Sequence, residues 1–135
     1  MAEVGDTYKH TFIITSEQVR DFASISGDNN PIHLDAAYAA NTVFKKPIIH
    51  GIFSASTFSK FFGTEFPGEG TIYISQTMQF LRPMYPDTEY EAQVVINNID
   101  KIRNIGKFDC KIVDKATNKA TLTGEAMLMH KEIFK

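Results

Sequence analysis

The chain has 135 residues, of which 43% are hydrophobic and 22% charged, and this composition is typical of one globular domain spanning residues 1–135. Its 14 basic and 16 acidic side chains form no long run of either sign, which argues against the broad basic surface that nucleic acids and anionic membranes require. With one cysteine, no signal-peptide pattern and no apolar run long enough to span a bilayer, we expect a cytoplasmic protein without disulfides.

The chain opens with a predicted strand and a capped helix. Residues 8–15 alternate between two faces and predict a strand. Thr15 and Gln18 have the spacing of a capping box, and Gly27 is a helix stop. A short helix is therefore predicted between them, and it delivers the chain to Asp28.

The next segment is rich in turn formers. It begins Asp28-Asn-Asn-Pro31, where the proline disfavours a helical conformation for Asn30. Asp35 is placed to cap a second short helix. We therefore expect His33 on an irregular loop between two helices.

Residues 48–63 form the most apolar helical segment of the chain. Apolar side chains occupy nearly every helical face of this segment, apart from small hydroxyl residues. They are Ile49, Ile52, Phe53, Ala55, Phe58, Phe61 and Phe62. A helix that is hydrophobic all round is typically buried, and this one is too short to cross a membrane. We predict a central helix around which the rest of the chain wraps.

The second half of the chain predicts a run of antiparallel strands. Alternating residues predict one long strand over residues 72–80 and further strands around 90–96, 108–112 and 122–128. One strand, then helices, then a block of strands indicates an α+β domain. We predict a single hot-dog domain, in which an antiparallel sheet wraps around the buried central helix and the 28–35 loop lies between short helices.

The segment from Ser26 to Asp35 carries the most specific motif. It reads Ser-Gly-Asp-Asn-Asn-Pro-Ile-His-Leu-Asp and resembles the hydratase motif of MaoC-like (R)-specific enoyl-CoA hydratases. The resemblance continues through His50-Gly51 and the segment from Pro67 to Gln76, and it weakens after about Ile96. It implies a hot-dog enzyme that hydrates trans-2-enoyl-CoA to (R)-3-hydroxyacyl-CoA.

The resemblance also implies a catalytic site built from Asp28, His33 and the backbone amide of Gly51. Hydration of a conjugated thioester needs a base for the water, an acid for Cα and a donor for the charge on the thioester oxygen. Histidine suits proton transfer near neutral pH, and a carboxyl group in a dry pocket can hold a proton. We expect His33 to act mainly as base and Asp28 mainly as the Cα proton donor. Gly51, near the start of the central helix, is expected to bind the oxygen.

Other residues are expected to bind substrate or support the site. Asn30 is expected to hold the loop, and Ser59 matches a family position that supports the site by hydrogen bonding. The candidates for the phosphates of coenzyme A are Lys45, Lys46, Arg82 and Arg103. We expect His10, His50 and His130 to be structural.

The sequence has no Gly-rich phosphate loop, no metal-ligand spacing and no dinucleotide fingerprint. We therefore expect no metal and no bound cofactor, with coenzyme A present only as part of the substrate. Cys110 lies in an alternating stretch without a second cysteine, and we expect an inert thiol.

Two alternatives remain open. A dehydratase acting on an (R)-3-hydroxyacyl carrier protein would use the same catalytic pair but would recognise an acidic protein through a basic surface. A non-catalytic acyl-thioester-binding module would retain only the pocket, and the complete set of acid, base and oxyanion glycine argues against it.

Assembly and chain length are predicted from the fold. A single hot dog leaves a sheet edge and part of its central helix poorly covered, so we expect a homodimer. Bulky side chains along the acyl tunnel favour a short to medium acyl chain. They are Phe53, Phe58, Phe61, Phe62 and Tyr73.

Overall fold

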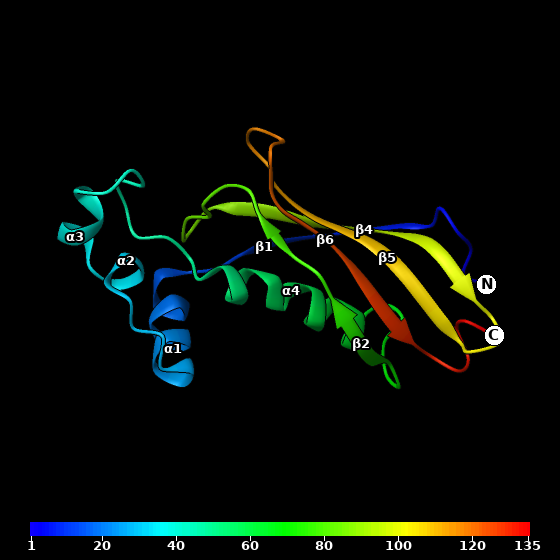
Figure 1. The fold of residues 1–135 in the computed structure, drawn as a ribbon. Helices are drawn as coiled ribbons and strands as arrows, with labels where there is room; N and C mark the ends of the chain where they lie inside the picture. The colour runs from blue at the N-terminus through cyan, green and yellow to red at the C-terminus, as the bar shows by residue number, and fades with distance from the viewer.

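A six-stranded antiparallel sheet dominates the computed structural model, which describes all 135 residues (Figure 1). The strands are β1 (Thr7–Ile13), β2 (Ile72–Gln76), β3 (Gln79–Phe80), β4 (Glu89–Asp100), β5 (Ile105–Asp114) and β6 (Ala120–Met129). Their order is β1-β4-β5-β6-β2, and β3 also pairs with β6. The helices are α1 (Ser16–Ser26), α2 (Pro31–Leu34), α3 (Ala36–Ala40) and α4 (Gly51–Thr64).

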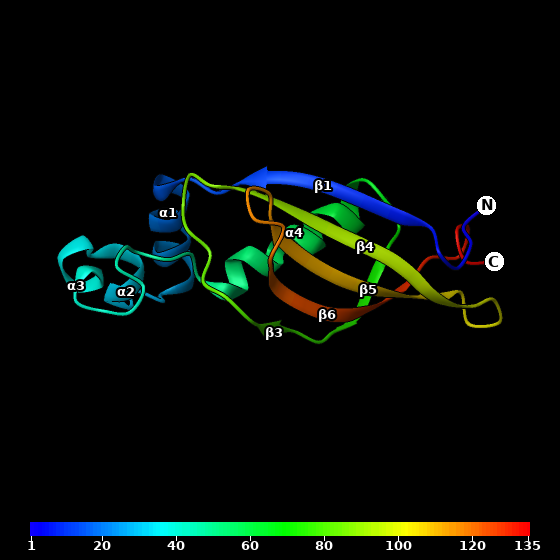
Figure 2. The ribbon, with the colours of Figure 1, turned by 90° about the horizontal axis from the view of Figure 1, so that it is seen from above.

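Helix α4 lies in the curl of the sheet, as Figures 1 and 2 show. Phe58 and Phe62 are fully buried there, and the Phe62 ring lies 5.0 Å from that of Phe108 on β5. The predicted α+β architecture, a sheet around a central helix, is confirmed. The prediction that this helix is buried all round is wrong for the single chain, because its opposite side, which carries Ile52 and Ser59, is exposed.

The capping signals of α1 are confirmed. Thr15 Oγ1 accepts a hydrogen bond from the Gln18 N–H at 3.1 Å, and Gln18 Oε1 accepts one from the Thr15 N–H at 2.9 Å. Gly27 ends the helix in the left-handed region at φ 79° and donates its N–H to the Ala23 carbonyl. Only glycine adopts this conformation at little cost, so the turn into the next segment is fixed locally.

The long strand predicted over residues 72–80 is split into β2 and β3. Both pieces pair with β6, and β3 continues the register of Ser75 and Gln76 at the end of β2, after a one-residue shift between Tyr73 and Ser75. They therefore form one edge that is interrupted at Thr77 and Met78. At the interruption Thr77 exchanges hydrogen bonds with the backbone of Glu125. Its carbonyl oxygen lies 1.9 Å from the position that a Cβ of Gly124 would take. The break therefore depends on a contact with a residue far along the chain, which alternation in the segment itself cannot reveal.

Helices α1, α2 and α3 lie beyond one end of the sheet and form a helical lobe, residues 16–40 (Figures 1 and 2). The two chain termini lie near the opposite end. The segment that follows α3 returns to the sheet and leads into α4. None of the four helices has the length and hydropathy of a membrane span.

Candidate active site

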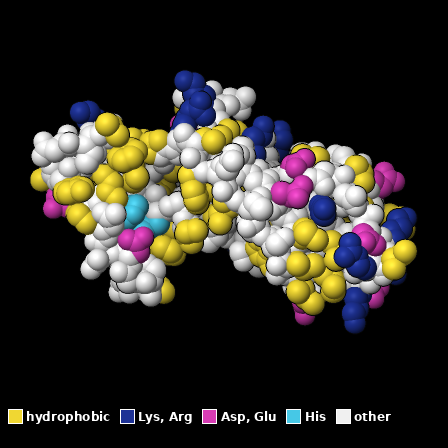
Figure 3. All heavy atoms as spheres, viewed as in Figure 1, with side chains coloured by type: hydrophobic (Ala, Val, Ile, Leu, Met, Phe, Trp, Pro, Cys, Tyr) yellow, Lys and Arg dark blue, Asp and Glu magenta, His cyan; other side chains and the backbone are white.

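A cavity of about 420 Å³ opens beside the start of α4. His33 and Gly51 line it, and most of the remaining wall is apolar. The apolar wall includes Phe44, Ile52, Phe80, Leu81, Met84 and Leu122. Figure 3 shows histidine and acidic side chains together at the surface, on the side of the molecule where the helical lobe lies, and hydrophobic side chains border them. An apolar cavity with a few polar groups on its wall is typical of a small-molecule site.

His33 lies in the one-turn helix α2, so the prediction that it lies on an irregular loop is wrong. The turn forms because Pro31 takes the first helical position, where its missing N–H is not needed. Asn30 has a non-helical backbone with φ −53° and ψ 126°, as its position before proline predicts, and its Oδ1 accepts the Ile32 N–H at 3.3 Å. Asn30 therefore holds the segment as expected, by capping the helix that carries His33.

Two hydrogen bonds attach α2 to the segment before α4. The Ile48 N–H donates to the Ile32 carbonyl at 3.2 Å, and His33 Nδ1 lies 2.8 Å from the Ile48 carbonyl. Because a carbonyl only accepts, Nδ1 must carry the hydrogen, and in the neutral ring the lone pair is on Nε2. This is the tautomer in which Nε2 can take a proton.

Burial is the main influence on the pKa of His33 and lowers it below the usual histidine value. His50 lowers it further, whereas the hydrogen bond to Ile48 and the carboxylate of Asp28 oppose the shift. The net effect favours the neutral ring at neutral pH, which is the form required of a general base.

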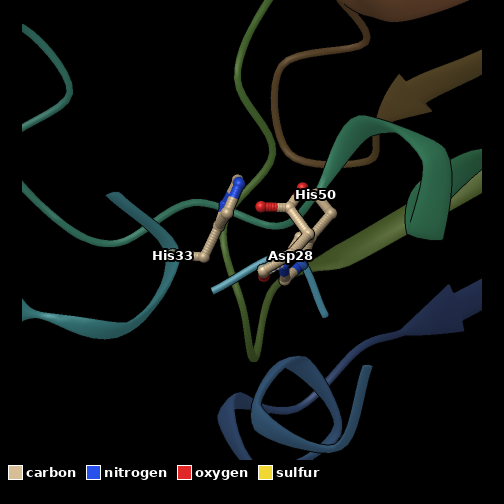
Figure 4. A group of neighbouring side chains, drawn as sticks. All are labelled: Asp28, His33 and His50. Carbon is tan, nitrogen blue, oxygen red and sulfur yellow. Dashed lines mark hydrogen bonds between the residues drawn. The ribbon is translucent and has the colours of Figure 1, made fainter. Parts of the chain in front are cut away.

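Asp28 follows Gly27, the residue that caps the end of α1, and its backbone is hydrogen-bonded on both sides. Its N–H donates to Ser26 Oγ at 3.1 Å, and its carbonyl accepts from His50 Nε2 at 2.9 Å. Its Oδ1 accepts the Asn30 N–H at 3.3 Å. Asp28 is exposed, so the single chain does not give it the dry pocket that we expected. The carboxylate nevertheless lies within 4.8 Å of the His33 imidazole, so the structure brings the predicted pair together (Figure 4).

Gly51 is the first residue of α4. The preceding residue makes no side-chain cap to the helix, so the first-turn N–H groups keep their hydrogen-bonding capacity. A Cβ at Gly51 would lie 2.6 Å from Cε1 of Phe80. Glycine therefore accommodates the close approach of the Phe80 ring. Gly51 lies at the cavity wall, at the helix start, where the helix dipole favours negative charge.

His50 lies within the site and contacts His33, although the sequence predicts only a structural role for it. It is 2% exposed, and its ring stacks on that of His33 with centroids 3.8 Å apart. Figure 4 shows Asp28, His33 and His50 together. The sequence signal that could indicate more than a structural role is its position directly before Gly51.

The donor atoms of Asp28, His33 and His50 lie within 4.8 Å of one another, as they would in a metal site. However, the two imidazoles are stacked with an interplanar angle of 25°, and the lone pair of each lies in its own ring plane. Both lone pairs would have to meet one ion at about 2 Å, the length of a zinc–nitrogen bond. Nearly parallel planes do not converge over that distance, so the geometry argues against a shared ion.

Ser59 does not reach the site. It is exposed on the outer side of α4 and does not line the cavity. Ser54, one turn from the start of α4, is buried and lines the cavity, and its hydroxyl donates to the His50 carbonyl at 3.4 Å. The two serines face different sides of the helix, a difference that depends on how α4 is oriented against the sheet.

Of the four basic residues expected near coenzyme A, the structure places one on the cavity. Arg82 lines it and donates from Nη1 to the Ala120 carbonyl at 2.6 Å. Lys45 is exposed away from the cavity wall, and Lys46 Nζ lies 4.9 Å from the centre of the Tyr85 ring. Arg103 pairs with Asp100 in the β4–β5 turn, at the opposite end of the sheet from the helical lobe (Figure 1).

The five bulky residues expected along the acyl tunnel do not line the cavity. Phe58, Phe61 and Phe62 are buried in the core, and Phe53 stacks on Phe22 of α1. Tyr73 packs on Phe62 and hydrogen-bonds to Gln76. The alternation of apolar faces could not distinguish the wall of the cavity from the core behind it.

The comparisons with known proteins concern the family and the fold. The model of the MaoC like domain matches residues 2–119. The chain is 36% identical over 126 residues to an (R)-specific enoyl-CoA hydratase of Aeromonas caviae, covering 93% of each chain. A solved (R)-hydratase from A. caviae superposes with a TM-score of 0.90 at 34% identity, over 95% of this chain and 96% of that one.

A second kind of relative is named for a different substrate. The chain is 30% identical to a mitochondrial 3-hydroxyacyl-[acyl-carrier-protein] dehydratase of Arabidopsis thaliana, over 93% of this chain and 76% of the relative. Both relatives align with this chain over most of their length. The chain belongs to the MaoC-like domain family.

Proposed function

We propose that this protein hydrates trans-2-enoyl-CoA thioesters to (R)-3-hydroxyacyl-CoA and catalyses the reverse dehydration. The observation that carries the proposal is the hydrogen bond of His33 Nδ1 to the Ile48 carbonyl, which leaves Nε2 as an acceptor, in an imidazole that lies near Asp28 and lines an apolar cavity. The similarity in sequence and structure to (R)-specific hydratases supports the same reaction and stereochemistry.

In the proposed hydration, His33 Nε2 removes a proton from water as the water oxygen bonds to Cβ. The π electrons of the double bond move toward Cα and the thioester carbonyl, where negative charge develops. Asp28, which is protonated at the start of this proposed step, delivers its proton to Cα, and the two groups together hold the water. Each group then exchanges its proton with the other or with solvent, so that both return to their starting states.

The developing charge on the thioester oxygen needs a donor that is already in place. The Gly51 N–H supplies it in this proposal, because Gly51 starts an uncapped helix and lies on the cavity wall. The acyl chain would occupy the apolar cavity, whose volume of about 420 Å³ suits a short to medium chain. Arg82 is the basic residue positioned to meet a phosphate of coenzyme A.

We propose that the reaction needs no metal and no bound cofactor, since hydration requires only proton transfer and charge stabilisation. The stacked arrangement of His33 and His50 supports this view. The purified protein should therefore keep its full rate after dialysis against EDTA. A rate that falls and is restored by one added metal ion would contradict the proposal.

The test of function is the loss of enoyl absorbance of crotonyl-CoA when the purified protein is added. Asp28→Asn and His33→Gln keep the size of each side chain and remove its proton transfer, so each should reduce the rate by at least about a hundredfold. A folded wild-type protein that hydrates neither crotonyl-CoA nor longer enoyl-CoA thioesters would overturn the proposal.

The main alternative is dehydration of a (R)-3-hydroxyacyl carrier protein, and the similarity to the Arabidopsis dehydratase favours testing it. Carrier proteins are acidic and bind through basic surfaces, whereas this chain has a net charge of −2. The two functions separate when the same acyl group is offered on coenzyme A and on carrier protein and kcat/KM is compared. No turnover of either would leave the acyl-thioester-binding module.

We also propose that two copies of the chain form a homodimer in a reducing cytoplasmic compartment. Support for the dimer comes from the edge formed by β2 and β3, where Ile72, Ile74 and Phe80 are exposed. Support for the compartment comes from Cys110, which is buried without a partner and whose pKa burial raises to about 12. Sedimentation of the pure protein and fractionation of the source cells test the two parts.

A further inference from the structure

His50 lies at the junction of the three groups assigned to catalysis. Its Nε2 donates to the Asp28 carbonyl at 2.9 Å, its ring stacks on His33, and the next residue is Gly51. Because a carbonyl only accepts, Nε2 carries the hydrogen and the neutral ring leaves a lone pair on Nδ1. Nδ1 of His50 is buried and has no hydrogen-bond partner in the structure.

An ordinary packing role does not account for these contacts. The ring is 2% exposed and lies edge-on against Phe22 with centroids 4.8 Å apart, in surroundings where an apolar ring would also fit. Histidine at this position leaves one buried nitrogen unsatisfied, which costs free energy. It also provides no side-chain cap to α4. What histidine adds over an apolar ring is the bond to the Asp28 carbonyl.

We propose that His50 is a positioning residue that fixes Asp28 and His33 relative to each other and to the Gly51 N–H. The bond to the Asp28 carbonyl holds the turn after α1, and the ring forms a flat support for the His33 imidazole. This inference deepens the proposed hydratase function and rests on it. Small displacements of catalytic groups reduce rates strongly, because proton transfer requires heavy atoms near hydrogen-bond distance.

Two substitutions separate the contributions of the bond and the ring. His50→Phe keeps a ring on His33 and loses the donor to Asp28. His50→Gln loses the ring but keeps an amide nitrogen at the same number of bonds from Cβ as Nε2. We expect His50→Phe to lower kcat on crotonyl-CoA about tenfold or more with KM changed less than about twofold. His50→Gln should retain kcat within about threefold of the wild type.

The pH profile gives a readout that a purely structural role would not move. The titratable side chains that influence the pKa of His33 are Asp28, which raises it, and His50, which lowers it. Because His50 lowers the pKa of His33, both variants should move the acid limb of kcat/KM to higher pH. An unchanged acid limb together with unchanged kcat in folded His50→Phe would overturn the inference.

His130 offers a matched control. Its Nε2 also donates to a backbone carbonyl, that of Glu69, at 2.8 Å, but at the end of β6 away from the helical lobe (Figure 1). His130→Phe should lower the Tm and leave both kcat and the acid limb unchanged. An equal loss of kcat in His130→Phe and His50→Phe would mean that general loosening of the fold is responsible, and would contradict the inference.

Two further comparisons keep the inference testable. If His50→Phe does not fold, His50→Asn replaces it, since its amide is one carbon shorter than that of glutamine and does not reach Asp28. Equal kcat for the Asn and Gln variants would then overturn the inference. If the wild type does not hydrate enoyl-CoA, the proposed function fails separately. In that case the ring nitrogen NMR resonances of His33 test whether His50 positions His33. They should change in His50→Asn and stay as in the wild type in His130→Phe.

Discussion

At the scale of single residues, the chemistry depends on which nitrogen of each histidine carries hydrogen. Both His33 Nδ1 and His50 Nε2 lie within 3 Å of a backbone carbonyl, so both protons are placed by the main chain. The partners are Ile48 for His33 and Asp28 for His50. A backbone acceptor cannot change its own protonation, so the tautomer of His33 is preserved while the side chains around it exchange protons.

The lowered pKa of His33 predicts the pH dependence of activity. Only the neutral ring accepts a proton, so kcat/KM should fall on the acid side with a midpoint below the free histidine value of about 6.5. The folding stability that comes from this lowered pKa is fully present above about pH 6.5, the pKa of a free histidine. It is lost as the pH falls through the pKa that His33 has in the folded state. Rates measured from about pH 5 to about pH 8 test this. An acid midpoint at or above the free value, or one that persists in His33→Gln, would contradict the assignment.

The contact between Gly51 and Phe80 predicts the effect of one methyl group. In Gly51→Ala the new Cβ would lie 2.6 Å from the Phe80 ring, which must move within the cavity wall. Because Phe80 is about half exposed, the ring can move without unfolding the protein. We expect kcat/KM to fall about tenfold, a loss that corresponds in free energy to a modest overpacking cost. The Tm should change little. Adding Phe80→Ala should recover most of the loss, and failure to do so would place the defect at the amide itself.

At the scale of elements, local signals predicted most helix and strand positions. The capping box of Thr15, the stop at Gly27 and the cap at Asp35 all act within a few residues, so the sequence was sufficient for them. Alternation likewise located β4, β5 and β6. The motif led to Asp28 and His33 in the same way, since their spacing is local and their turn chemistry recognisable.

The features that were missed depend on contacts between distant residues. The split between β2 and β3 depends on Gly124, and the place of His50 depends on the Asp28 carbonyl twenty-two positions earlier. The cavity wall depends on which face of α4 meets the sheet, so Ser54 lines it and Ser59 does not. No periodicity within one segment carries this information.

The close approach of Gly124 to the Thr77 carbonyl allows a test of why the edge is interrupted between β2 and β3. Substitution of Gly124 by alanine places a Cβ 1.9 Å from the Thr77 carbonyl oxygen, and Thr77 is held in place because its N–H donates to the Glu125 carbonyl and its Oγ1 accepts the Glu125 N–H. We expect Gly124→Ala to lower the free energy of unfolding by about 3 kcal/mol, the upper part of the usual range for overpacking. Urea unfolding measures it. Gly63→Ala is the control, because a Cβ there meets nothing within 4 Å and should be neutral or stabilising by up to about 1 kcal/mol. Similar effects at both glycines would contradict the explanation.

At the scale of the whole molecule, the sheet covers α4 on one side and the helical lobe closes one end (Figure 2). The outer side of α4 and the adjoining sheet edge remain exposed, and they carry large apolar side chains. These are Ile52, Ile72, Ile74 and Phe80. Asp28 is exposed at the same time, although the proposed chemistry benefits from a dry site. An edge of this kind is a template for pairing with another strand.

The proposed homodimer is tested by placing a charge on this edge. Ile74 on β2 is 43% exposed, and Ile74→Lys would bury an unpaired charge if a second copy covers the edge. We expect the wild type to sediment with twice the mass of one chain and the variant to sediment as a single chain. Ile102→Lys is the matched control, because Ile102 is 95% exposed in the β4–β5 turn and a charge there should leave the dimer intact. A wild-type protein that sediments as one chain, or a dimer that survives Ile74→Lys and dissociates with Ile102→Lys, would rule out pairing through β2.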